Sequence, residues 1–114
     1  MEINEIIKEI NHFRDERNWR QYHNEKDLAI SISLEANELL EIFQWRSSEE
    51  AKAESLEHLK EEIADVLIYT LMMADNLDLD VSDIIREKIV KNGVKYPISQ
   101  AKGSNKKYTE LENN

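Results

Sequence analysis

Glycine and proline are almost missing from this chain, whose 114 residues include 2 Gly and 1 Pro. Sheet proteins need these residues for their many tight turns, so the composition argues against a β fold. Much of the remainder is Leu, Ile, Ala, Glu and Lys, which favour helices. The length suits one domain with a modest core, and the absence of Cys excludes a disulfide scaffold and thiolate metal ligands. The sequence therefore predicts an all-α fold.

Apolar residues recur at helical spacing in four segments. We expect helices over about 3–19, 28–45, 48–74 and 81–95, of which the third starts with a loose turn and is strongly apolar from Leu56 to Ala74. The last three are preceded by side chains suited to capping: Asp27, then Ser47 or Ser48, then Asp78 or Asp80. Pro97 ends the regular structure, and 98–114 is expected to be an extended basic tail behind a domain at 1–97.

The second and third predicted helices are apolar nearly all the way round. Between Ile63 and Ala74 only Asp65 is charged. Such a helix is either the central helix of one subunit or a helix that packs against a second chain. A monomer of this length has few places to bury two of them, so we expect a four-helix bundle completed by oligomerisation, as a dimer or tetramer.

The charge of the chain is strongly acidic, with a net value of −9, and is unevenly distributed. Residues 1–80 hold 8 basic and 20 acidic side chains, whereas 81–114 hold 7 basic and 4 acidic. Duplex nucleic acid is therefore not expected as a partner, although a nucleotide can still bind beside local Lys and Arg or a metal ion. No apolar run is long enough to span a membrane, and the N-terminus does not read as a signal peptide, so we expect a cytoplasmic protein.

Four carboxylates fall where the helical pattern is apolar. Glu35 and Glu38 are spaced i, i+3 on the second predicted helix, and Glu62 and Asp65 repeat the spacing on the third. Burying unpaired carboxylates is costly, and no Lys or Arg stands one turn from Asp65 to neutralise it. Either these side chains lie on a solvated face, or they take up protons, or they bind a cation. Carboxylate oxygens without Cys would suit Mg²⁺ or Mn²⁺.

Several segments together resemble the MazG-like nucleoside triphosphate pyrophosphohydrolases, and most closely the dCTP pyrophosphatase branch. They are FRDERNWRQYH (13–23), LEANELLEIFQW (34–45), EEIADVLIY (61–69), KNGVKYP (91–97) and KYTEL (107–111). One departure is Asn37, where many members carry Gly. The resemblance implies an all-α enzyme in which Glu35, Glu38, Glu62 and Asp65 bind Mg²⁺. Water would attack the α-phosphorus, giving a nucleoside monophosphate and pyrophosphate.

The resemblance also suggests where the nucleotide is held. It places Trp19 and Trp45 near the base. The commoner role of a Trp at the end of a helix is packing in a core or interface. His23 is a weaker candidate for the base, and Glu41 or Gln44 can help to select it. The hydroxyl of Tyr69 can reach the ligand from the Glu62/Asp65 side of its helix. Phosphate or sugar contacts are expected from four residues of the basic last helix: Lys88, Asn92, Lys95 and Tyr96. Lys88 and Asn92 are the preferred candidates among them. Lys106, Lys107 and Tyr108 either form an arm over the triphosphate or belong to a free tail.

A reading of another class remains, that of a non-catalytic acidic helical module that binds a protein partner through its apolar faces. Such a module has no reason to retain four carboxylates within an apolar pattern. The sequence therefore favours a metal-dependent nucleotide pyrophosphohydrolase.

Overall fold

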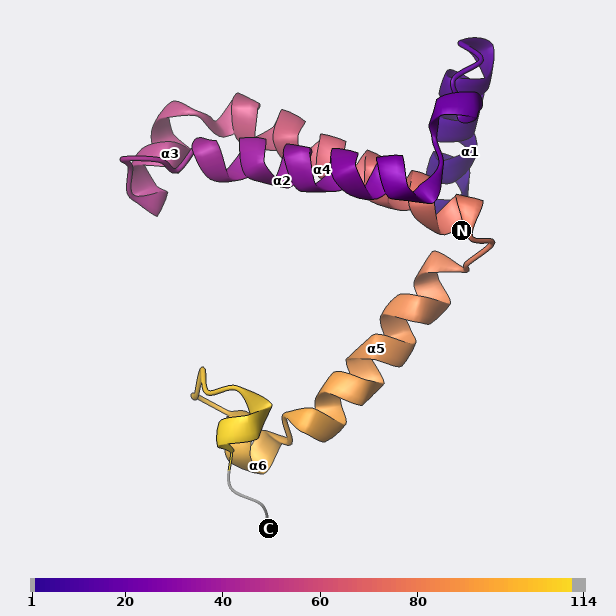
Figure 1. Cartoon of the computed structure of the whole chain (residues 1–114). Coiled ribbons are helices and arrows are strands. Elements are labelled where there is room, and N and C mark those ends of the chain that lie inside the picture. Colours follow the sequence, from indigo (N-terminus) through magenta and orange to yellow (C-terminus); the bar gives the residue numbers. More distant parts are fainter. Residues whose placement is uncertain (1, 112–114) are drawn as a thin grey trace. The chain divides into compact units, whose positions relative to one another are not determined.

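The structure is a computed structural model that describes residues 2–111 (Figure 1). All regular structure among these residues is helical, which confirms the predicted all-α fold. The chain divides into two compact units, Met1–Leu79 and Asp80–Asn114, and each is described by itself. No helix within the described range is long and apolar enough to cross a membrane. Residues 112–114 of the predicted tail, and residue 1, lie outside the described residues.

The first unit is built on two neighbouring antiparallel helices. Its elements are α1 (Glu2–Glu16), a 3₁₀ turn η1 (Arg20–Tyr22), α2 (Glu25–Glu41), α3 (Ser48–Glu54) and α4 (Leu56–Asn76). Figure 1 shows α2 and α4 running side by side in opposite directions, with α1 near the end of α4 and α3 near its start. Successive turns of α2 therefore face successive turns of α4 along most of the length of the two helices.

The first two helices are shorter than the sequence predicted. α1 ends at Glu16 rather than near Trp19, because Asn18 takes a left-handed backbone conformation with φ 57°. α2 begins at Glu25, and its N-cap is Asn24 rather than Asp27, since the Asn24 side chain accepts the amide of Asp27 at 2.9 Å. α2 ends at Glu41, before Trp45, where φ is 64°.

The third predicted helix is two helices. Ser47 caps α3 in a capping box, in which Ser47 Oγ accepts the amide of Glu50 and Glu50 Oε1 accepts the amide of Ser47. Ser55, with φ −131° and ψ 28°, leaves the helical region and separates α3 from α4. Ser47 is thus the cap among the two predicted alternatives. The loose start expected before Leu56 is a separate short helix, which ends at the break at Ser55.

The core of the first unit lies where α2, α3 and α4 meet. Ile42, Ala51 and Leu59 are buried together there, with Leu39 and Phe43 packed against them. Large apolar side chains of α2 and α4 are nevertheless exposed: Ile30, Leu34, Leu40, Ile63 and Leu67. Other large apolar side chains of the chain are exposed as well. The unit therefore does not cover its own apolar helix faces, and the predicted oligomer stays a prediction.

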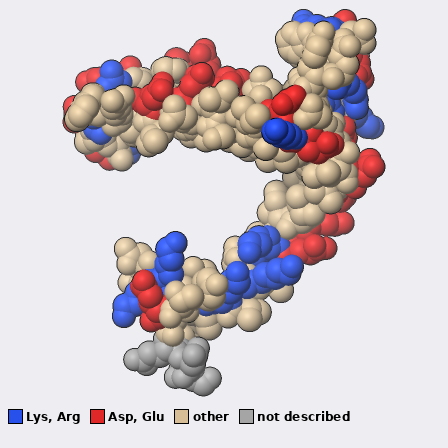
Figure 2. All heavy atoms as spheres, viewed as in Figure 1, with Lys and Arg blue, Asp and Glu red and all other residues tan. Residues whose placement is uncertain are grey.

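The second unit contains α5 (Val81–Lys95), α6 (Ile98–Ala101) and a 3₁₀ turn η2 (Tyr108–Glu110). Asp80 caps α5, because its side chain accepts a hydrogen bond from the backbone amide of Asp83 at 3.0 Å. It is one of the two caps that the sequence predicted. Within this unit, acidic side chains lie near the start of α5 and basic ones gather further along it (Figure 2). The segment after Pro97 was predicted to be extended, and its described part contains two short helical turns, α6 and η2, with residues 102–107 between them outside any helix. The predicted division into 1–97 and 98–114 stays a prediction.

Candidate metal and nucleotide site

Three carboxylates of the first unit converge between α2 and α4. Glu35 comes from α2, and Glu62 and Asp65 from the facing turns of α4. One oxygen of each side chain lies within 4.8 Å of one oxygen of each of the others. Glu62 is buried, while Glu35 and Asp65 are half-buried. The i, i+3 spacing on α4 puts Glu62 and Asp65 on one side of the helix, and the antiparallel packing brings Glu35 to them.

Glu38, the fourth predicted ligand, lies one turn after Glu35 and is exposed. It does not belong to the group of three convergent oxygens. Its side chain is nevertheless close enough to hydrogen-bond with Glu35 and to influence the pKa of both Glu35 and Glu62. The four residues thus form one acidic surface, with three carboxylates at its centre and Glu38 at its edge.

The acidic centre carries a large electrostatic cost. Burial raises the pKa of Glu35 to about 7, and hydrogen bonding and repulsion by Glu38 add to the increase. The pKa of Glu62 is also raised, again chiefly by burial and then by Glu38. Glu35 Oε2 and Glu62 Oε2 are both buried without a hydrogen-bond partner among the described residues. Unpaired buried oxygens are costly, so this arrangement favours a bound cation or a bound proton.

The donor set fits a hard divalent cation. No Lys or Arg of the described residues lies at ion-pair distance from Glu35, Glu62 or Asp65, and the basic group found at such a distance is the His58 imidazole, 3.3 Å from Glu62 Oε1. Carboxylate oxygens are the ligands of Mg²⁺ and Mn²⁺, and Mg²⁺ typically binds through few carboxylates while retaining waters and substrate phosphates. The orphaned oxygens of Glu35 and Glu62 are available for this role.

Tyr69, one turn after Asp65 on α4, faces the same carboxylates. Burial raises the pKa of its hydroxyl, and the negative charges of Glu35, Asp65 and Glu38 raise it further. The hydroxyl therefore stays protonated at neutral pH and can donate a hydrogen bond toward the acidic centre. This position agrees with the side of the helix on which the sequence placed it.

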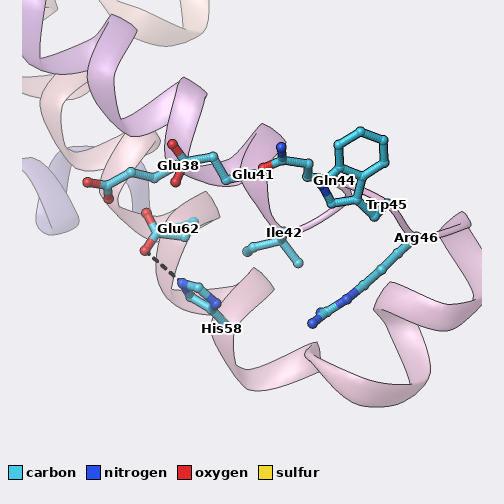
Figure 3. A pocket seen from close by; sticks show the side chains of 8 residues that line it. All are labelled: Glu38, Glu41, Ile42, Gln44, Trp45, Arg46, His58 and Glu62. Atoms are coloured by element: carbon cyan, nitrogen blue, oxygen red, sulfur yellow. Dashed lines mark ion pairs between the residues drawn. The ribbon is translucent and has the colours of Figure 1, made fainter.

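A hollow of about 350 Å³ opens next to Glu38 and Glu62, between the end of α2 and the start of α4 (Figure 3). Its lining comes from the end of α2, the turn after it and the start of α4: Glu38, Glu41, Ile42, Gln44, Trp45, Arg46, His58 and Glu62. Trp45 stands at its edge and is 93% exposed. The hollow therefore joins the predicted ligands Glu38 and Glu62 to three residues suggested for the base: Glu41, Gln44 and Trp45.

Two polar residues of this hollow were not predicted from the sequence, His58 and Arg46. His58 Nε2 lies 3.3 Å from Glu62 Oε1, and Arg46 Nη1 donates to Ser55 Oγ at 2.8 Å. The signal for His58 was its i, i+4 spacing to Glu62 on a helix. For Arg46 the only signal in the sequence was its position directly after the FQW segment.

Trp19 and His23 lie in the connection between α1 and α2, near each other. Their rings meet edge to face at 6.4 Å, and Trp19 also contacts Phe13 at 5.7 Å. Burial lowers the pKa of His23, and the charges of Arg14 and Arg20 lower it further, so its imidazole is neutral at pH 7. Its Nδ1 is buried without a hydrogen-bond partner in the described structure.

A buried arginine holds the end of α1 against the end of α4, and sequence reasoning missed it. Arg14 is fully buried, and its Nη2 donates to Asp75 Oδ2 at 3.2 Å and to Asn76 Oδ1 at 3.1 Å. Asn76 Nδ2 in turn donates to the backbone oxygen of His23. The connection that bears Trp19 and His23 is therefore tied to the end of α4.

The remaining predicted contacts belong to the second unit. Lys88 and Asn92 lie on α5, and Tyr96 follows its last residue. Tyr96 meets Tyr108 edge to face at 6.1 Å, and Lys95 Nζ lies 4.8 Å from the centre of the Tyr108 ring. The approach of these residues to the carboxylates of the first unit stays a prediction.

Comparison with known proteins finds relatives of similar sequence and a similar solved structure. The chain is 35% identical over 104 residues to dCTP pyrophosphatase 1 of Rattus norvegicus and of Homo sapiens, covering 87% of this chain. It spans only 61% of the length of either relative. A crystal structure of a pyrophosphatase from Archaeoglobus fulgidus matches with a TM-score of 0.80 and 44% identity, over 85% of this chain and 94% of that one.

The family model named MazG-like matches residues 30–111, which include Glu35, Glu38, Glu62 and Asp65. This range covers well over half of the chain and both compact units. The resemblance found in the sequence motifs is thereby confirmed: this chain belongs to the MazG-like family.

Proposed function

We propose that this chain is a nucleoside triphosphate pyrophosphohydrolase that depends on Mg²⁺, or alternatively on Mn²⁺. The observation that carries the proposal is the convergence of Glu35, Glu62 and Asp65 oxygens within 4.8 Å, with two buried oxygens lacking partners. The similar proteins named above as pyrophosphatases support the reaction class. A protein-interaction module would gain nothing from burying carboxylates without partners.

The carboxylates would hold the cation, with Glu38 completing the set from the edge of the site. When bound, the metal neutralises charge on the phosphates, polarises phosphoryl oxygens and lowers the pKa of a water. The chain's own residues would hold the triphosphate in line for attack by water on the α-phosphorus. The bond from the α-phosphorus to the bridging oxygen breaks, and the products are the monophosphate and pyrophosphate.

A glutamate would act as general base, because a carboxylate whose pKa lies near neutrality can accept a proton from the attacking water. Tyr69 would donate its hydroxyl proton in a hydrogen bond to ligand or carboxylate. Neither role requires movement of α2 or α4, since both helices already present these side chains to one place.

The substrate would be a dCTP-like pyrimidine nucleotide, a proposal supported by the names of the similar proteins from rat and human. Trp45 at the edge of the hollow, and Trp19 with His23 on the α1–α2 connection, would contact the base. Base–aromatic stacking contributes about 1–3 kcal/mol and tolerates many bases. Selection between bases would therefore fall to polar groups such as Glu41 and Gln44.

The second unit would supply a positive charge and hydrogen-bond donors to the phosphates or sugar. Lys88, Asn92 and Tyr96 are the proposed contacts, and Lys106–Tyr108 would close over the triphosphate from the basic tail, 98–114. A homo-oligomer, either dimer or tetramer, would cover the exposed apolar faces of α2 and α4. The proposal places the enzyme in the cytoplasm, acting on free nucleotides rather than on duplex nucleic acid.

The test is pyrophosphate release from each of the common NTPs and dNTPs, with Mg²⁺ and with excess EDTA. The proposal expects release that requires the metal, with dCTP among the best substrates. The Trp45→Ala variant should raise KM for every accepted nucleotide by a similar factor, roughly 5- to 160-fold, with kcat largely unchanged, because it removes uniform binding. No release from any nucleotide would overturn the proposed reaction, and an unchanged KM would remove Trp45 from the base site.

A further inference from the structure

Glu62 is contacted by a second side chain of its own helix, His58, one turn earlier on α4. His58 Nε2 lies 3.3 Å from Glu62 Oε1, and Figure 3 shows the two side chains meeting at the wall of the hollow. The His58 side chain is 57% exposed, whereas that of Glu62 is 11% exposed. The contact therefore links a solvent-facing imidazole to a buried carboxylate.

The two oxygens of Glu62 have different surroundings. Oε1 faces the imidazole of His58, while Oε2 is buried and has no partner among the described residues. Glu62 is also one of the three side chains whose oxygens converge. A carboxylate with one oxygen held and the other unoccupied is oriented to bind a cation through the unoccupied oxygen.

We propose that His58 is a positioning residue for the metal site: it holds Glu62 Oε1 and thereby aims Oε2 at the centre formed with Glu35 and Asp65. His58 is not itself among the convergent ligands. Groups that contact a metal ligand from outside commonly fix its orientation, and their removal costs about 10- to 100-fold in metal affinity. This inference rests on the proposed metal dependence and adds a residue that the motifs do not include.

The chain offers a matched control for an ordinary surface pair. His12 and Glu16 on α1 have the same i, i+4 spacing, with Nε2 of His12 3.2 Å from Oε1 of Glu16. Both side chains are mostly exposed, at 77% and 58%. Such exposed pairs contribute little. A loss of metal affinity that follows His58 but not His12 therefore cannot come from a general His–Glu effect.

The experiment measures binding of Mn²⁺ alone, by the electron paramagnetic resonance signal of the free ion, at one fixed neutral pH. His58→Ala is expected to weaken Mn²⁺ binding about 10-fold or more. His58→Gln keeps an Nε2 donor at a similar reach and should restore binding to within about 3-fold of wild type. His12→Ala should bind as wild type, and thermal melts without metal check that all three variants fold.

Wild-type affinity in His58→Ala would overturn the inference, and so would a loss in His58→Gln as large as that in His58→Ala. Pyrophosphate release by the wild-type chain reports separately on the proposed function. A chain that binds Mn²⁺ through this site but hydrolyses no nucleotide would refute the reaction while leaving the role of His58 supported. A wild-type chain that does not bind Mn²⁺ would refute both.

Discussion

Asp65 is a half-buried carboxylate on α4. Its substitution should remove metal-dependent activity without unfolding the chain. The Asp65→Ala variant should lose metal-dependent turnover by about 100-fold or more, because a ligand is missing from the site that stabilises charge on the phosphates. It should remain folded, since one repelling carboxylate is gone from a group that includes Glu35 and Glu62. Pyrophosphate release and a thermal melt without metal measure the two effects.

Glu61→Ala is the control for Asp65→Ala, because Glu61 is an exposed acidic residue of the same helix. It removes the same charge from α4 without touching the convergent oxygens. Wild-type turnover is expected from Glu61→Ala. Normal turnover in Asp65→Ala, or an equal loss in both variants, would contradict the assignment of Asp65 as a ligand.

Glu35 gives the metal-free chain a pH dependence of known sign. Its pKa rises from an ordinary 4.5 to about 7 on folding, so the folded state holds a proton that the unfolded state loses. The stability contributed by this group therefore falls as pH rises between these two values, and the full penalty is present above them. Glu35→Gln removes the penalty and should melt at higher temperature than wild type above neutrality.

Melting temperatures in EDTA, compared between wild type and Glu35→Gln across the acidic to neutral range, measure this effect. The difference should grow as pH rises through the window and then level off. With saturating Mg²⁺ the order should reverse, because metal binds the native wild-type site and stabilises it by mass action. A pH-independent difference in EDTA would mean that Glu35 is not protonated in the fold.

At the scale of elements, the capping box of α3 fixes the turn that carries Trp45 and Arg46. Ser47→Ala removes the acceptor for the Glu50 amide and should cost about 1 kcal/mol of the free energy of unfolding. Ser48→Ala, at the exposed first residue of α3, is the control and should have a much smaller effect. Urea unfolding of both variants measures the difference. Equal stabilities would show that the cap contributes nothing in solution.

The sequence was informative where local chemistry decides the structure. Ser47 was one of two predicted caps, and the structure uses it; the i, i+3 spacing of Glu62 and Asp65 predicts a shared face, and their oxygens converge. The convergence of Glu35 on that face required only that α2 and α4 pack antiparallel. Motif spacing thus anticipated the acidic centre, because helical periodicity converts sequence separation into direction.

Helix ends and contacts between distant segments were less predictable. Asn18 favours the left-handed conformation that ends α1, so that end could have been anticipated, but Trp45 at φ 64° is unusual for a bulky residue and gave no signal. Arg14 lies near the end of an amphipathic helix, where an exposed charge is the rule. Its burial depends on Asp75 and Asn76, more than 60 residues away in the chain, and no local pattern reveals that pairing.

At the scale of the whole molecule, the exposed apolar faces predict self-association. Ile30 and Leu34 of α2, and Ile63 and Leu67 of α4, remain accessible in the single chain. An obligate interface over such faces would bury more than about 2,000 Å². Sedimentation velocity at micromolar concentration should therefore detect a dimer or tetramer, and Leu34→Glu should weaken it. A stable wild-type monomer would contradict this prediction.

The central claim is that the acidic centre supports metal-dependent attack of water on the α-phosphorus. The most direct measurement is mass spectrometry of the products after dCTP is turned over in ¹⁸O-labelled water. With Mg²⁺, one labelled oxygen should enter dCMP and none should enter pyrophosphate, and neither product should form in EDTA. Label in pyrophosphate, or formation of dCDP and phosphate in their place, would contradict the claim.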